Sequence, residues 1–249
     1  TDQSSDIVVY NRKTNVVTTS PKISTANREN FPSWGPEGRF LYYLSADQAF
    51  EDFDSRFFSY YSLVRIEYNQ EENSWGETDT IYNARKEGRS LTFPRVSPDG
   101  KHILFCLIDY GYFSINHEES DLYLMDLETR EYRKLSINSE YNDSYHAWSQ
   151  DGRWVVFSSK RHHRLYSAPH FVYFDEDMHF HKPFILPQKD PHFYETYLVN
   201  YNIPEFINGK VNLNPRQIRD ILYQEGEDVI FDEEVDVDSL YFHQKDVQK

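Results

Sequence analysis

A turn motif followed by an apolar run occurs three times in the chain, and no other feature constrains the fold as strongly. The copies occupy residues 31–39, 93–101 and 145–153. Their turn glycines, Gly38, Gly100 and Gly152, are 62 and 52 residues apart. A unit that repeats at roughly 40 to 60 residues is typical of propellers and solenoids.

The motif has the chemistry of a tight hairpin turn. In the second copy, Pro98 suits the second turn position, Asp99 the third, and Gly100 accepts a positive φ. The apolar runs after the turns do not alternate with polar residues; they cover 40–44, 103–108 and 154–157. Such runs indicate strands buried on both faces, as neighbouring propeller blades require.

A second repeated piece completes the unit. Residues 121–129, with a return strand at 132–135, match residues 6–14 and 16–18 position for position. We therefore predict an all-β propeller of four-stranded antiparallel blades, whose short inner strands end at Trp34, Val96 and Trp148. The expected units are an outer hairpin of a preceding blade (1–20), three blades (21–83, 84–136 and 137–190) and a C-terminal extension (191–249).

The extension contains one predicted helix. Asn214 suits the N-cap, Pro215 the first helical position and Gln217 the third, and Gly226 is a natural stop. We expect this short helix to dock on the blades, and the acidic tail from Glu225 to be partly disordered.

Composition excludes several classes of function. The formal net charge is −15, which argues against a nucleic-acid partner. The chain has no apolar run long enough to span a membrane. Its one cysteine, Cys106, lies in an apolar strand, so an intrachain disulfide is impossible and we expect a buried thiol.

Topology predicts a recognition surface. The loops between the second and third strands of each blade must open on one face, together with the connections between blades. That face gathers aromatic and basic side chains of the kind that dominate binding interfaces. The predicted partner-binding residues are Phe53, Phe57, Phe58, Tyr110, Tyr112, Phe113, His117, Arg161, His162 and His163. The leading hypothesis is a non-enzymatic scaffold that binds a protein or glycan through this face.

A metal-dependent, carbohydrate-active propeller is the alternative. Glu176, His179 and His181 form the candidate metal set, because two histidines and a carboxylate suit a divalent cation. The competing interpretation is a polar outer hairpin. There is no G-x-S-x-G elbow and no phosphate-binding glycine loop, so we predict no catalytic residues and no cofactor beyond a possible divalent cation.

The repeats, over about residues 1–190, resemble the TolB-like, WD-repeat-like six-bladed propellers, whose signature is a W-S-P-D-G-K/R turn before an apolar strand. Residues 93–101, 109–111, 121–124, 182–191 and 201–206 look like exported, uncharacterised propeller proteins of Bacteroidetes. That likeness implies a C-terminal half of a propeller and a periplasmic or cell-surface location.

Three blades and a hairpin do not make a six-bladed ring. Either further blades come from a missing N-terminal half or another chain, such as the partner of a homodimer, or segments near Val199 and Val229 complete the 1–20 hairpin and close a four-bladed ring. We favour the first. An open half-ring exposes strand faces and edges that invite pairing, so a partner or dimer is then expected.

Overall fold

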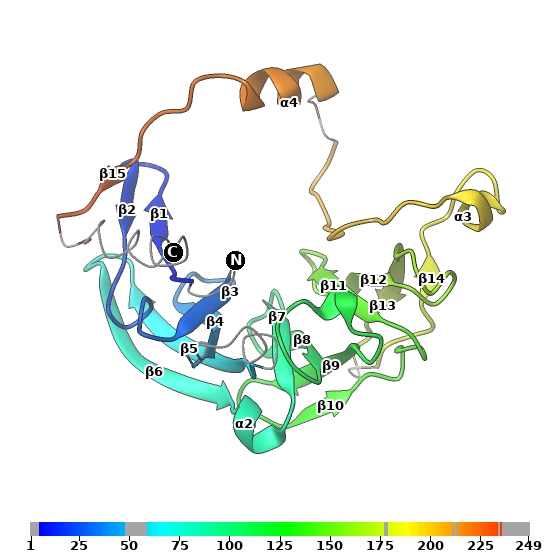
Figure 1. Cartoon of the computed structure of the whole chain (residues 1–249), viewed down its shortest axis with the longest axis horizontal. Coiled ribbons are helices and arrows are strands. Elements are labelled where there is room, and N and C mark those ends of the chain that lie inside the picture. The colour runs from blue at the N-terminus through cyan, green and yellow to red at the C-terminus, as the bar shows by residue number, and fades with distance from the viewer. Residues whose placement is uncertain are drawn as a thin grey trace, which may run out of the picture.

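The computed structural model describes residues 5–47, 59–176, 179–210, 212, 214–233 and 235. Three four-stranded antiparallel sheets stand side by side around an open arc (Figure 1). Each follows sequence order from its inner to its outer strand. This arrangement confirms the predicted fold class, an all-β propeller with three complete blades in this chain.

The strand bounds match the repeats. The first blade contains β3 (Arg28–Trp34), β4 (Phe40–Ala46), β5 (Ser62–Asn69) and β6 (Ser74–Tyr82). The second contains β7 (Ser90–Val96), β8 (His102–Ile108), β9 (Asp121–Asp126) and β10 (Tyr132–Lys134). The third contains β11 (Asp143–Trp148), β12 (Trp154–Ser159), β13 (Ala168–Tyr173) and β14 (Phe184–Ile185). The inner strands end at the three predicted residues; the exact limits of the units as domains stay a proposal.

The turns after the inner strands share one geometry. Gly38, Gly100 and Gly152 have φ of 66°, 72° and 70°. Within the second turn the Gly100 amide donates to the Ser97 carbonyl at 2.9 Å, and the Ser97 hydroxyl lies 2.5 Å from Asp99 Oδ1. The positive φ explains why glycine is present in every copy although its neighbours vary.

Packing between blades explains the apolar runs. In β8, Phe105 packs with Leu44 and Leu63 of the first blade. Its neighbour Cys106 points the other way and packs with Val155 and Phe157 of the third. Because both faces of the strand are covered, an apolar residue is needed at every position rather than every second one.

The inner strands carry a repeated irregularity. Their pairing register shifts between Asn30 and Ser33 in the first blade, with equivalent shifts in β7 and β11. A non-glycine residue with positive φ occupies each bulge: Phe31 (48°), Phe93 (54°) and Tyr145 (44°). Bulky residues rarely adopt this conformation, so the surrounding packing must hold them there.

The N-terminal hairpin belongs to a fourth, smaller sheet. It consists of β1 (Val9–Asn11) and β2 (Val16–Thr18), and β15 (Ile230–Phe231) adds to β2 in parallel. The segment near Val229 therefore joins the hairpin, as the four-bladed alternative required, whereas Val199 lies outside any strand. The described residues form three strands here, not a complete fourth blade.

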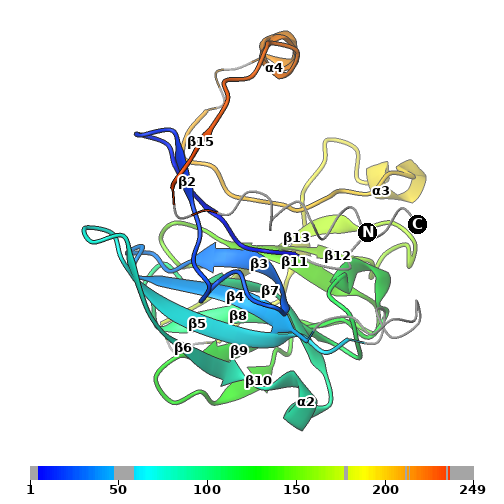
Figure 2. The same cartoon turned by 60° about the vertical axis from the view of Figure 1, so that its left-hand side comes forward.

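The C-terminal extension crosses the opening of the arc (Figure 1). It contains α3 (Phe193–Thr196) and α4 (Pro215–Leu222), and α4 has the predicted capping box between Asn214 and Gln217. The expected docking of this helix is wrong: α4 has no buried residue and stands away from the sheets (Figure 2). Its apolar side chains Ile218, Ile221 and Leu222 are all exposed.

Another part of the extension covers the free flank of the third blade. The Ser158 hydroxyl donates to the Asn202 carbonyl at 3.0 Å, and the Ser167 hydroxyl donates to the Tyr201 carbonyl at 2.6 Å. The rings of Phe171 and Phe206 meet edge to face. The chain thus shields one of the two sheet faces that an open arc leaves uncovered.

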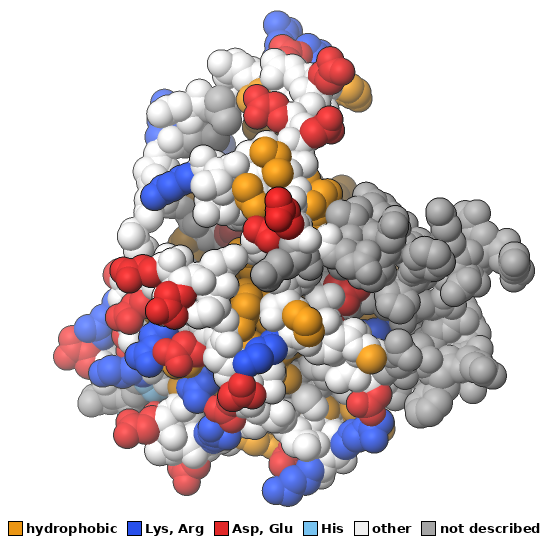
Figure 3. Space-filling model, turned by 90° about the vertical axis from the view of Figure 1, so that its left-hand side faces the viewer, with side chains coloured by type: hydrophobic (Ala, Val, Ile, Leu, Met, Phe, Trp, Pro, Cys, Tyr) orange, Lys and Arg blue, Asp and Glu red, His pale blue; other side chains and the backbone are white. Residues whose placement is uncertain are grey.

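The charged side chains on the surface and the character of the helices agree with the amino-acid composition. Acidic side chains are interspersed with Lys and Arg on the face shown in Figure 3. None of the helices in the described part of the chain has the length and apolar character that a bilayer-spanning segment needs.

Candidate functional site

One side of the arc, opposite the glycine turns, carries the loops within blades and the connections between them; we call it the loop face. Its loops are 109–120 and 160–167, and its connections are 83–89 and 135–142. The connections contain the short helix α2 (Ala84–Glu87), and the first loop contains the 3-10 turn η1 (Ser114–Asn116). This placement follows from the antiparallel order of every blade.

The 109–120 loop is tied to both neighbouring blades. The Gly111 amide donates to the Ser59 carbonyl at 2.7 Å, on the side of the first blade. On the other side, Asn142 Nδ2 donates to the Ser114 carbonyl at 2.5 Å, and Lys160 Nζ donates to the Ile115 carbonyl at 2.8 Å. These hydrogen bonds to both neighbouring blades hold the loop in one conformation.

This loop exposes some of its predicted aromatic residues and buries others. Phe113 is 46% exposed and Tyr110 36% exposed. Tyr112 instead turns inward and packs edge to face on Tyr61, with ring centroids 5.5 Å apart. Tyr110 rests on the His117 ring at 4.9 Å, and His117 Nδ1 lies 2.7 Å from Glu119 Oε1.

The basic residues of the 160–167 loop serve the interior. The Arg161 guanidinium donates to Asp143 Oδ1 and to the Ile137 carbonyl, each at 2.9 Å. The His162 ring stacks on His170 with centroids 5.2 Å apart, and burial lowers the pKa of His162. His163 Nε2 hydrogen-bonds to the Tyr194 carbonyl of the extension.

Phe53, Phe57 and Phe58 lie outside the described residues. Sequence reasoning missed two exposed residues of the same loops, Tyr60 (41% exposed) and Leu165 (73%). Both lie within loops that the repeats define, but neither motif nor spacing distinguishes an exposed loop side chain from one that packs inward.

The candidate metal residues converge only in part: His179 and His181 both lie against Asp175, with His179 Nδ1 3.7 Å from Asp175 Oδ1. His181 Nε2 lies 3.0 Å from Asp175 Oδ2, whereas the Glu176 carboxylate accepts a hydrogen bond from Arg153 at 2.7 Å. No group of three or more metal-ligating side chains occurs among residues that the structure describes. The geometry here is that of a polar hairpin between β13 and β14.

Cys106 and His146 form a buried pair, with Sγ 3.8 Å from Nδ1. His146 Nε2 lies 2.9 Å from the Leu104 carbonyl, which only accepts, so Nε2 carries the proton. Burial raises the pKa of the Cys106 thiol to about 12 and lowers the pKa of His146 to about 3. Nucleophilic catalysis needs a thiolate, so this neutral pair is structural.

Comparisons with known proteins give similarity at the level of the fold. No family model matches the chain, and a search of curated proteins finds no match. Similar solved structures include TolB from Acinetobacter baumannii, at 20% identity and a TM-score of 0.44, covering 67% of this chain and 34% of that one. Putative TolB from Agrobacterium tumefaciens has 18% identity and a TM-score of 0.34, over 68% and 66% of the two chains.

An auxiliary nutrient binding protein from Bacteroides thetaiotaomicron is also similar, with 11% identity and a TM-score of 0.39, over 74% of this chain and 42% of that one. The matched region spans about a third of the Acinetobacter protein. Two of the similar structures carry the name TolB. The blades themselves define the class of protein: it is a β-propeller.

Proposed function

We propose that this protein is a non-enzymatic binding scaffold that presents the aromatic part of its loop face to a protein or glycan partner. The observation that carries the proposal is the 109–120 loop. It is anchored to blades on both sides, yet it leaves Phe113 46% and Tyr110 36% exposed.

Preorganisation is the physical reason for choosing this loop. A binding loop that is already ordered loses little conformational entropy when a partner docks. Aromatic side chains add large contact area with few rotatable bonds, and they are enriched among the residues that dominate binding free energy. Phe113 also rests on the inward-facing Tyr112 ring, at 4.5 Å between centroids, which limits its movement.

The predicted set of contact residues divides into two groups. Tyr110 and Phe113 form the proposed contact surface, and His117, whose side chain is 13% exposed, supports the Tyr110 ring. Four others support the loops from within, since their side chains contact other parts of the chain: Tyr112, Arg161, His162 and His163. We also propose an exported location, in the periplasm or at the cell surface. Further blades or a second copy would lie beside the first blade. Both statements rest on the resemblance alone.

Site-specific photo-crosslinking tests the proposal. A photoreactive phenylalanine analogue replaces Phe113, and the purified chain is exposed to an extract of the source cells and, separately, to an array of glycans. The control carries the same analogue at Tyr10, which is 49% exposed on β1 and lies outside the loop face.

We expect one defined adduct, or one class of retained glycan, from position 113 and none from position 10. The double variant Tyr110→Ala/Phe113→Ala is then expected to weaken binding of that partner at least about tenfold. Equal labelling from both positions, or unchanged affinity in the double variant, would contradict the proposal.

A further inference from the structure

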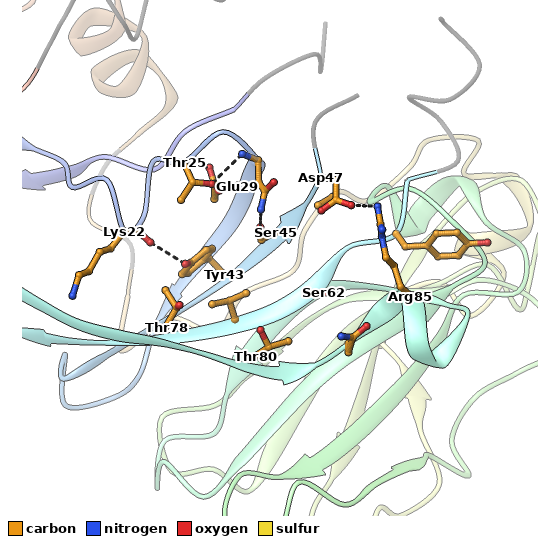
Figure 4. A pocket seen from close by; sticks show the side chains of 15 residues that line it. Lys22, Thr25, Glu29, Tyr43, Ser45, Asp47, Ser62, Thr78, Thr80 and Arg85 are labelled. Carbon is orange, nitrogen blue, oxygen red and sulfur yellow. Dashed lines mark hydrogen bonds and ion pairs between the residues drawn. The ribbon is translucent and has the colours of Figure 1, made fainter. Parts of the chain in front are cut away.

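A separate polar groove lies on the flank of the first blade. It has a volume of about 330 Å³ and runs between the 22–29 segment and the sheet of β3 to β6 (Figure 4). This size lies within the range of small-ligand sites, whereas a protein surface contacts broader and flatter areas. None of its residues belongs to the aromatic contact surface proposed above.

Hydroxyl groups dominate its walls. Because cross-strand partners share a face, Tyr43, Val64 and Thr80 lie on the same side of the sheet and line the groove. Ser45 and Thr78 lie beside Tyr43 and Thr80 (Figure 4). Thr78 and Thr80 are exposed, and within the described residues their hydroxyls have no hydrogen-bond partner. They are thus available as both donors and acceptors.

The charged groups of the groove are already paired. Lys22 Nζ donates to the Gly76 carbonyl at 2.8 Å and to Glu77 Oε1 at 2.7 Å. Arg85 forms an ion pair with Asp47 at one end. Among the described residues that line it, the groove therefore has none of the free cations that phosphate or carboxylate recognition needs.

The Glu29 carboxylate accepts from both the hydroxyl and the backbone amide of Thr25. Glu29 is 1% exposed, so its charge is shielded from a ligand by its own partners. The open groups that remain are uncharged hydroxyls and amides, together with the Tyr60 ring, which is 41% exposed at the rim.

We propose that this groove binds a short neutral saccharide. A sugar offers many hydroxyls that match the donor and acceptor groups of Thr78, Thr80 and Ser45, and the apolar C–H face of a pyranose packs well on an aromatic ring such as that of Tyr60. An apolar ligand would leave the hydroxyls unpaired, which costs free energy. The proposal is independent of the loop face and its partner.

Calorimetric titration of the whole chain tests the proposal, with maltose, cellobiose, lactose and N,N′-diacetylchitobiose as probes. The variant Thr78→Val/Thr80→Val removes two exposed hydroxyls and keeps the β-branched shape that suits the strand. The matched control is Thr18→Val on β2, which makes the same change outside the groove.

We expect at least one disaccharide to bind, and the double variant to lose about tenfold or more in affinity while Thr18→Val keeps it. Tyr110→Ala/Phe113→Ala is expected to leave this binding unchanged, which separates a failure here from a failure at the loop face. Absence of heat with every probe at millimolar concentration, or equal affinity in the double variant, would overturn the proposal.

Discussion

Phe31 and Phe93 meet edge to face across the boundary between the first two blades, with ring centroids 5.7 Å apart. The contact continues from Phe93 to Tyr145 of the third blade, at 5.1 Å. All three residues have positive φ on the innermost strands. Ring packing between blades thus offsets a backbone conformation that is unfavourable in each blade alone.

This relationship predicts an unusual order of stability at position 93. Phe93 is 3% exposed, so Phe93→Ala is expected to lower the free energy of unfolding by about 3 kcal/mol. Phe93→Gly also loses the ring but relieves the positive φ, so it should be at least as stable as the alanine variant. Urea denaturation compares the two; a glycine variant clearly less stable than alanine would show that φ is not strained there.

The glycine turn gives a second prediction. Gly100→Ala is expected to cost about 1–2 kcal/mol, because alanine at φ 72° suffers a backbone clash although its Cβ would lie 3.6 Å from the nearest atom. Gly35→Ala is the matched control: its Cβ also has room, at 3.5 Å, and its φ is not positive. We expect the control to unfold at or above the wild-type denaturant midpoint, and equal losses in both would contradict this explanation.

A substitution at Arg161 tests whether this side chain stabilises the fold or binds a partner. Removing its guanidinium leaves Asp143, which is fully buried, without its ionic partner. Arg161→Ala is therefore expected to lower the free energy of unfolding by about 3–5 kcal/mol. Arg39→Ala, which breaks an exposed pair with Glu67, should cost less than about 1 kcal/mol. A thermal shift for Arg161→Ala no larger than that of the control would refute the structural role.

Glu29 predicts a pH dependence. Burial raises its pKa from the ordinary 4.5 to about 7, with a further contribution from Asp6. The folded state therefore holds a proton that the unfolded state releases between these values, and this contribution to stability falls as pH rises from about 4.5 to about 7. The full effect is up to about 3 kcal/mol.

Glu29→Gln removes this titration while its amide oxygen still accepts from Thr25. The difference in unfolding free energy between variant and wild type should therefore shift in favour of the variant between pH 5 and pH 8. Comparing the two proteins cancels the opposite contribution of His146 and His170, whose lowered pKa values reduce stability in acid. A difference that stays flat across this range would refute a raised pKa.

Cys106 is expected to resist modification in the native state. It is fully buried and burial raises its pKa to about 12, so little thiolate forms at pH 8. Ellman's reagent should titrate one thiol only after denaturation in guanidinium. Native labelling at the denatured rate would show that the thiol is accessible and would reopen a catalytic reading of the Cys106–His146 pair.

The blades were predictable from local features of the sequence. A turn glycine is required by local backbone geometry alone. A continuous apolar run indicates that both faces of a strand are covered. Two further features were predictable because each depends on neighbours within a few residues. They are the ends of the inner strands, at Trp34, Val96 and Trp148, and the capping box of α4.

Which loop side chains are exposed depends on contacts between segments that are far apart in the sequence. The sequence predicts Arg161 and Tyr112 as contact residues. In the structure, Arg161 forms an ion pair with Asp143 and the Tyr112 ring packs on Tyr61. The pairing of β15 with β2 and the groove beside β6 likewise join segments that are far apart in the chain. A side chain's exposure depends on which distant groups reach it, and local pattern does not record those distances.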